Sequence, residues 1–148
     1  MTLTRTKSGL QNLHILKGVD LVVYTEGGEQ RTFTKEEVLA GAGHQKSVDI
    51  RFWKQMFARF LPGKNVKFLS VGSCTSLNKI ALDIAEGDLK NVCVAMDRDY
   101  SAFWGNRVEH RQIVRTRTYS WENELFQTDV VFRAFEQLVM GPIYLLDP

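Results

Sequence analysis

Three acidic residues have the types and the spacing that can bind a divalent metal ion. Glu26 follows the apolar run 19–25, and Asp97 and Asp99 follow the apolar run 91–96. Ligands of open parallel sheets bind beyond the carboxyl ends of the strands, so the three carboxylates converge there if the two runs are neighbouring strands. Such a cluster repels itself unless a cation neutralises it, and Mg²⁺ takes carboxylate oxygens and substrate phosphates. The pattern therefore predicts a Mg²⁺ (or Mn²⁺) site.

Each acidic feature also has an ordinary explanation when it is taken alone. A Glu-Gly at a strand end, as at Glu26-Gly27, is commonly only a turn. An Asp-x-Asp pair such as Asp97 and Asp99 often occurs by chance. Their joint position at the two strand ends where ligands are expected favours the metal site over these explanations.

The elements that must position these residues alternate between strands and helices. Strands are predicted at 19–25, 66–71, 91–96 and 112–118. Amphipathic helices are predicted at 49–60, between 73 and 87, and at 129–139. A Thr34-x-x-Glu37 capping box indicates a short helical turn in the polar segment 28–47. This order predicts an α/β, Rossmann-like domain with a mainly parallel central sheet flanked by helices.

The composition limits the class of protein. A chain of 148 residues fits one domain, and 44% hydrophobic and 24% charged residues are ordinary for a globular protein. The net charge of +2 is too small to indicate a nucleic-acid partner by itself. We find no signal-peptide core and no apolar run near the roughly 18 residues that span a bilayer. We therefore expect a cytoplasmic protein without a membrane partner, in which Cys74 and Cys93 are reduced, buried and apolar in character.

A basic stretch supplies the candidates for nucleic-acid binding. On a strand, Arg111, Arg115 and Arg117 would share one face, and that face could follow a phosphate backbone. A solvated edge strand has the same pattern, because charge protects sheet edges against aggregation. Lys79, on the helix after Gly72, is a further candidate for a phosphate contact.

Two segments resemble the motifs of the Toprim domain. That domain carries a Glu, usually followed by Gly, after its first strand and an Asp-x-Asp after its third. The matching segments are Tyr24-Thr25-Glu26-Gly27 and Ala95-Met96-Asp97-Arg98-Asp99. Val71-Gly72-Ser73 is similar to the family's glycine turn after the second strand, and Asp49-x-x-Phe52-Trp53 resembles the first helix of OLD-type Toprim proteins.

A further segment is similar to a narrower family. Tyr119-Ser120-Trp121-Glu122-Asn123-Glu124-Leu125 resembles the "YS-x-EN-x-L" segment of a Toprim-related family. Its members sit beside ABC- or AAA-type ATPases in bacterial phage-defence operons, and include the nuclease subunit of PARIS-type systems. The resemblance divides the chain into an N-terminal extension (1–18), a Toprim-like domain (19–126, with an insertion at 28–47) and a C-terminal helix and tail (127–148).

The resemblance implies Mg²⁺-dependent phosphodiester hydrolysis of DNA or RNA. Asp97, Asp99 and either Glu26 or Glu122 would hold one or two Mg²⁺ ions, which orient the scissile phosphate and activate water. Glu26 could instead act as a general base, which requires it to be free of metal and within reach of the water. Glu122 is equally explained as a solvated carboxylate at the start of a helix.

Two other classes of function fit parts of the pattern. One is a non-catalytic Toprim-fold module that docks onto a partner such as an ATPase. The other is a different Mg²⁺-dependent phosphotransfer or phosphohydrolase enzyme, which is disfavoured because its nucleophilic Asp typically follows the first strand, where this chain has Glu26. The apolar run 143–146 fits either a place in the core or a homodimer contact.

Overall fold

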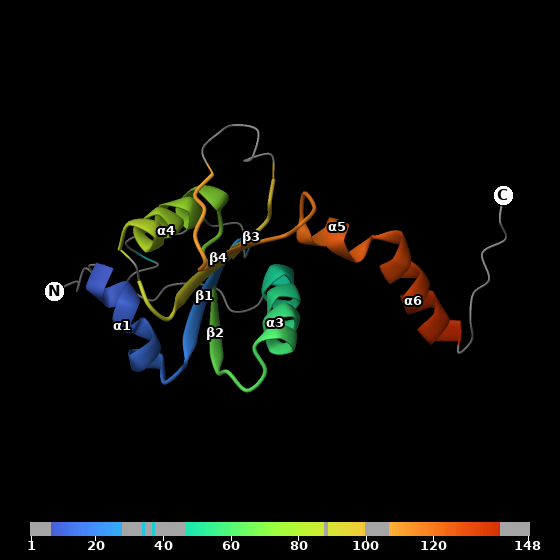
Figure 1. Ribbon diagram of the computed structural model, residues 1–148, viewed down its shortest axis with the longest axis horizontal. Helices are drawn as coiled ribbons and strands as arrows, with labels where there is room; N and C mark the ends of the chain where they lie inside the picture. The colour runs from blue at the N-terminus through green and yellow to red at the C-terminus, as the bar shows by residue number, and fades with distance from the viewer. Residues whose placement is uncertain are drawn as a thin grey trace.

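A four-stranded sheet organises the chain (Figure 1). The computed structural model describes residues 7–27, 34, 37, 47–87, 89–99 and 107–139. The sheet order is β2-β1-β3-β4, and every pairing is parallel. The strands are β1 (Leu21–Thr25), β2 (Val66–Ser70), β3 (Val92–Met96) and β4 (Ile113–Arg115). The structure therefore has the α/β fold that the alternation of strands and helices predicts.

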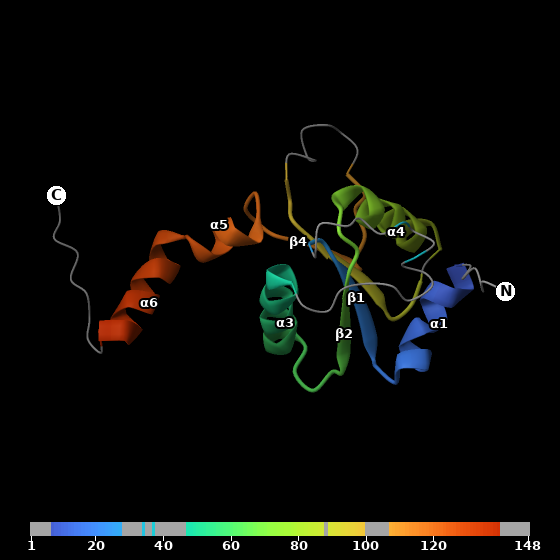
Figure 2. The same ribbon diagram turned by 180° about the vertical axis from the view of Figure 1, so that it is seen from behind.

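Three of the described helices cover the two faces of this sheet. The described helices are α1 (Lys7–Lys17), α3 (Val48–Phe60), α4 (Cys74–Gly87), α5 (Trp121–Leu125) and α6 (Thr128–Val139). Helices α1 and α4 cover one face and α3 covers the other (Figures 1 and 2). Helices α5 and α6, here called the C-terminal arm, extend away from the sheet in both views. In the described part of the chain, every helix is too short or too polar to cross a membrane.

Two apolar clusters form the core, one on each face of the sheet. Successive side chains of a strand point to opposite faces, so Val22 and Tyr24 pack with α1 and α4, whereas Val23 packs with α3. β3 is buried along its whole length. This confirms the central position expected of a strand that is apolar on both faces.

Helix α1 lies in the segment that the sequence analysis named an N-terminal extension. Leu10 and Leu13 are each 1% exposed and belong to the core cluster on the α4 side. The segment ends as helices commonly do, with His14 and Lys17 in the last turn and Gly18 at a φ of +62°. Its apolar periodicity is weak, because only two of its apolar residues face the core while Ile15 and Leu16 are exposed.

Strand β4 is shorter than the predicted strand 112–118. The backbone N–H of Thr116 still donates to the Met96 carbonyl (3.3 Å), but its hydroxyl group accepts the backbone N–H of Arg98 (2.9 Å). The next two backbone N–H groups, of Arg117 and Thr118, donate to a carboxylate instead of a strand. The pairing therefore ends because side chains satisfy the backbone there.

The predicted capping box is present. The backbone N–H of Thr34 donates to the Glu37 carboxylate (2.9 Å), and the Glu37 N–H donates to the Thr34 hydroxyl (3.2 Å). Most of the segment 28–47, and the apolar run 143–146, lie outside the described residues.

The packing of α1 predicts a difference between two leucines of this helix. Leu13→Ala should lower the free energy of unfolding by about 2–5 kcal/mol, because it leaves a cavity in the core. Leu16→Ala, at a side chain that is 67% exposed, should change it by less than about 0.5 kcal/mol. Denaturant unfolding followed by circular dichroism measures both. Equal effects of the two substitutions would show that α1 does not pack on the sheet.

Candidate metal centre

The sheet topology places the ends of β1 and β3 side by side. The two strands are paired in parallel, and their register continues to Thr25 opposite Ala95. Glu26 follows β1 directly, and Asp97 follows β3 directly. The condition on which the predicted acidic site depends, that the two strands are neighbours, is therefore met.

Glu26 and Asp99 are brought together with a thiol that the sequence analysis did not select. One carboxylate oxygen of Glu26, one of Asp99 and the Sγ atom of Cys74 all lie within 4.8 Å of one another. Cys74 is the first residue of α4, and its backbone N–H donates a hydrogen bond to Glu26. Asp99 has a φ of +47°, a left-handed conformation that Asp tolerates better than most residues, and its N–H donates to the Tyr119 carbonyl (2.9 Å). Backbone hydrogen bonds thus fix the carboxylate of Glu26 and the main chain of Asp99.

Asp97 lies outside this group of three and is held by Trp121 instead. Its Oδ1 atom accepts the backbone N–H of Trp121, the first residue of α5 (3.0 Å). The indole Nε1–H of the same residue donates to Oδ1 of Asp49 (2.6 Å). The indole ring also packs on Phe52, with 5.6 Å between the ring centroids. Trp121 therefore joins Asp97 on the sheet to Asp49 on α3.

Gly27 explains how Asp49 reaches the strand ends. Gly27 has a φ of +84°, and a Cβ atom built on it would lie 1.6 Å from Oδ2 of Asp49. Only glycine accepts both that conformation and that contact. Asp49 stands in the first turn of α3, which begins one residue earlier than predicted and is capped by the hydroxyl group of Ser47. Gly27 therefore allows both the turn after β1 and the approach of Asp49 to the strand ends.

Burial and mutual repulsion raise the pKa values of these carboxyl groups. Burial, followed by the charges of three aspartates, raises the pKa of Glu26 to about 7. Those aspartates are Asp99, Asp97 and Asp49. Burial also raises the pKa of Asp97 to about 6. The hydrogen bond from the Trp121 backbone N–H lowers this pKa, and the charge of Glu122 raises it. In the described part of the chain, the groups that shift these two pKa values include no lysine and no arginine.

The thiol of Cys74 stays protonated in this environment. Burial raises its pKa, and the charges of Glu26 and Asp99 raise it further. The expectation that both cysteines are buried holds for Cys93 but not for Cys74, which is half-buried because it starts α4 at the edge of the sheet. Both cysteines are free thiols, as predicted.

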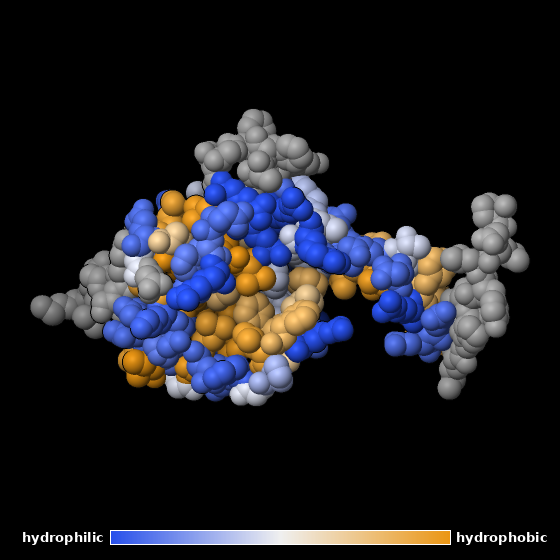
Figure 3. Space-filling view, viewed as in Figure 1, coloured by the Kyte–Doolittle hydropathy of each residue, from blue (hydrophilic) through white to orange (hydrophobic). Residues whose placement is uncertain are grey.

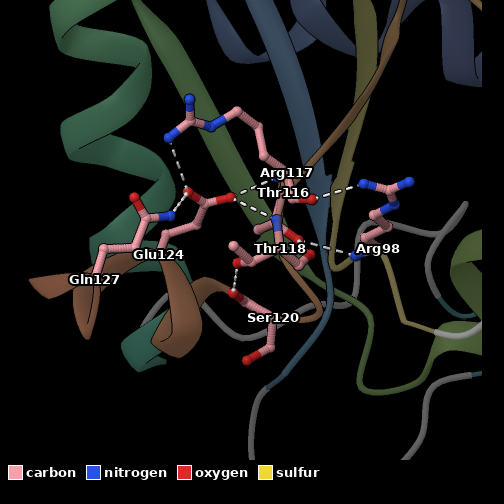
Figure 4. Close-up of polar contacts among 7 residues, drawn as sticks. All are labelled: Arg98, Thr116, Arg117, Thr118, Ser120, Glu124 and Gln127. Carbon is pink, nitrogen blue, oxygen red and sulfur yellow. Dashed lines mark hydrogen bonds and ion pairs between the residues drawn. The ribbon is translucent and has the colours of Figure 1, made fainter.

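A network of polar contacts fixes the segment between β4 and α5 (Figure 4). Glu124 accepts the backbone N–H groups of Arg117 and Thr118 and a side-chain N–H of Gln127 (3.2 Å). Burial alone would raise the pKa of Glu124, but these backbone hydrogen bonds and the Arg117 charge lower it below its ordinary value. The carboxylate of Glu124 is therefore a structural acceptor, which ties α5 to the end of β4.

The same network engages Arg98. Its Nη1–H donates to the Arg117 carbonyl (2.8 Å), and its backbone N–H donates to the Thr116 hydroxyl (2.9 Å) (Figure 4). The hydroxyl of Thr116 donates to the Thr118 carbonyl (2.9 Å), which tightens the turn. Arg98 therefore supports the segment that carries Trp121.

The predicted basic face is dispersed. Arg111 is exposed in the turn at the amino end of β4, opposite to the acidic edge. Arg115 ends β4, and its Nη1–H donates to the Val108 carbonyl (3.0 Å). Arg117 lies beyond the strand, where its guanidinium group is 3.6 Å from the Glu124 carboxylate. The three arginines do not share a strand face because β4 ends at Arg115.

The two remaining candidate residues are exposed. Lys79 lies on the surface of α4. Glu122 lies in the first turn of α5, and its charge raises the pKa values of Asp97 and Asp49. Glu122 therefore belongs to the electrostatic cluster, although no hydrogen bond within the described chain fixes it to the other carboxylates.

Comparison of the chain with protein-family models, with curated proteins and with solved structures gave no match. The fold and the site define an α/β domain with a parallel sheet and a cluster of carboxylates at the carboxyl edge of that sheet.

The raised pKa of Glu26 predicts an unusual dependence of stability on pH in metal-free buffer. The folded state has a pKa of about 7 against 4.5 for an unperturbed Glu. The folded protein binds this proton more tightly than the unfolded chain, so the free energy of unfolding falls as pH rises from about 4.5 to about 7. Glu26→Gln should remove the part of this fall that Glu26 causes, while Asp97, with a pKa of about 6, keeps its own part. The substitution should raise the unfolding temperature near pH 8 by roughly 2–4 °C, equivalent to about 1 kcal/mol.

Thermal unfolding in EDTA across this pH range provides the measurement. Glu86→Gln, at an exposed residue near the end of α4, is the control and should retain the wild-type pH profile. A wild-type unfolding temperature that is flat or rises between these pH values would contradict the electrostatic description of the cluster.

The double role of Trp121 predicts energetic coupling to Asp49. Trp121→Phe keeps an aromatic ring against Phe52 but removes the N–H that Asp49 accepts, and should cost about 1–3 kcal/mol. In a double-mutant cycle, Asp49→Ala, which removes the acceptor, should then be non-additive with Trp121→Phe by about 1 kcal/mol, because both remove the same contact. The exposed Asp20→Ala serves as the control and should be additive. Additivity in both cycles would mean that the hydrogen bond contributes nothing.

Proposed function

We propose that this chain is a Toprim-type, OLD-like nuclease domain that hydrolyses nucleic-acid phosphodiester bonds with Mg²⁺ (or Mn²⁺). One observation carries the proposal: acidic side chains are crowded at the carboxyl edge of the sheet, and their pKa values are shifted by burial and by one another rather than by any cation of the described chain. A divalent cation is the simplest group that relieves this repulsion.

The donor set fits such an ion at Glu26 and Asp99. Their carboxylate oxygens lie within ligand-sharing distance, and oxygen is the ligand that Mg²⁺ prefers. The neutral thiol of Cys74 is not a Mg²⁺ ligand, so its part is the backbone N–H that orients Glu26. Asp97 belongs to the same site through its charge, and Trp121 fixes its direction.

A bound Mg²⁺ would supply charge neutralisation at the phosphate and a more acidic water. Glu26 has two roles open to it: ligand, or base that removes a proton from the attacking water. A pKa near 7 suits a general base, while its position beside Asp99 suits a ligand. Glu122, exposed next to Asp97 and Asp49, is placed to attract hydrated cations rather than to hold one directly.

The substrate and the setting rest on the resemblance. Nucleic acid would approach the acidic edge. Arg115, which pairs with Met96 at the end of β4, is one candidate for a phosphate contact, and Lys79, Arg111 and Arg117 are the others. Cytoplasmic action in phage defence, beside an ABC- or AAA-type ATPase, follows from the similarity of the segment 119–125 to its family. A non-catalytic Toprim-fold module that docks onto a partner is the alternative.

Metal binding and cleavage test this proposal together. Wild-type protein should bind Mn²⁺ and Mg²⁺ in calorimetry near pH 8, and should cleave plasmid, linear DNA or tRNA in a reaction that EDTA stops. Asp99→Asn and Asp97→Ala should each lower the cleavage rate at least about 100-fold. Glu86→Gln, outside the cluster, should retain the wild-type rate.

The two proposed classes give different outcomes in this experiment. Metal binding without cleavage of any substrate would favour the non-catalytic module. Absence of both metal binding and cleavage would overturn the metal site and the nuclease activity. The unfolding temperature of each variant, measured in EDTA, shows whether a loss of activity comes from the site or from misfolding.

A further inference from the structure

Helix α6 has an apolar face that the described chain does not cover. Val131, Ala134, Phe135 and Leu138 recur at the spacing that places them on one side of a helix. Phe135 is 52% exposed and Leu138 is 78% exposed. A helix of 12 residues is marginally stable in water without tertiary packing. The apolar face of α6 therefore calls for a surface to pack against.

The body of the same molecule carries an apolar groove of about 670 Å³. The groove lies between α3 on one side and β4 with the residues after β4 on the other side. We call it the α3–β4 groove. Its apolar lining includes Phe52, Met56, Phe57, Phe60, Leu61 and Val114. Phe60 is 67% exposed, and apolar side chains reach the surface on both the body and the C-terminal arm (Figure 3). The groove has the composition that accepts one apolar face of a helix.

Charge is complementary between the groove and α6. Three arginines and one glutamate line the groove, which gives a net charge of +2: Arg59, Arg115, Arg117 and Glu124. Helix α6 carries Asp129, Glu136 and Arg133, which gives −1. A helix with a net negative charge would therefore meet a groove with a net positive charge.

We propose that α6 of one copy of this chain binds the α3–β4 groove of a second copy, and that the exchange is reciprocal. Within one copy, the bonds of Trp121 and Glu124 fix α5 to the body. Only Phe126 and Gln127 separate α5 from α6, and the arm points away from its own body (Figures 1 and 2). A second copy receives α6 without any change at that junction. Two-fold symmetry then forms the contact twice in each dimer.

Two exposed residues allow each half of the contact to be broken separately. Phe60→Glu places a charge in the groove, and Leu138→Glu places one on the apolar face of α6. Leu16→Glu on α1 is the matched control, because Leu16 and Phe60 are each 67% exposed but α1 lies on the other side of the sheet. Circular dichroism checks that each variant is folded, and sedimentation velocity in EDTA without nucleic acid reports association independently of the metal site.

The wild type and Leu16→Glu should sediment as dimers at tens of micromolar, and the two other variants should sediment as monomers. A mixture of Phe60→Glu and Leu138→Glu should regain a heterodimer, weaker than the wild-type dimer, because one groove and one helix remain intact. A monomeric wild type, or dimers that survive in both single variants, would overturn the proposal. A mixture that stays monomeric would also overturn it, because α6 would then bind its own groove or a different protein.

Discussion

Repulsion between carboxylates at one end of the sheet is the constraint on which the surrounding structure depends. Two neighbouring strands and the start of α3 bring Glu26, Asp49, Asp97 and Asp99 close together. A cluster of this kind lowers the stability of the folded state while all of its members are ionised. The raised pKa values of Glu26 and Asp97 reduce this repulsion, because part of the negative charge is absent near neutral pH. A stability cost retained at one edge of a fold is typical of functional sites.

Neutral hydrogen-bond donors orient three of these carboxylates. The backbone N–H of Cys74 reaches Glu26, and Trp121 supplies one backbone donor to Asp97 and one indole donor to Asp49. Donors without charge fix the direction of a carboxylate while leaving its negative charge available to an incoming cation.

Local patterns predicted the sheet well because the apolar run of a strand and the apolar period of a helix both lie within the element itself. The apolar runs gave β1, β2 and β3, and the periodicity gave α3, α4 and α6, each within about two residues. The end of β4 could not be predicted, because Glu124, seven residues further on, takes the backbone N–H of Arg117. Helix α1 was missed because its core contacts come from only two leucines.

At the strand ends, the sequence predicted Glu26, Asp97 and Asp99 as site residues, and the structure groups Glu26 and Asp99 with Cys74 while Trp121 holds Asp97. Only the resemblance to the first helix of OLD-type Toprim proteins indicated Asp49, and no pattern selected Cys74. Asp49 joins through Gly27 and Trp121, which are 22 and 72 residues away in the chain. Cys74 joins because α4 begins at the same edge. Nothing in a linear pattern of residues states such distances, since the packing of α3 and α5 sets them.

The contact between Gly27 and Asp49 has a consequence for how the chain can change length. It pins both ends of the stretch between them, so that the stretch begins and ends at the same point of the fold. Once the ends of a loop are fixed, doubling its length costs only about 0.6 kcal/mol of closure entropy. Residues added to or removed from this stretch should therefore leave the carboxylates in place, at a small cost in stability.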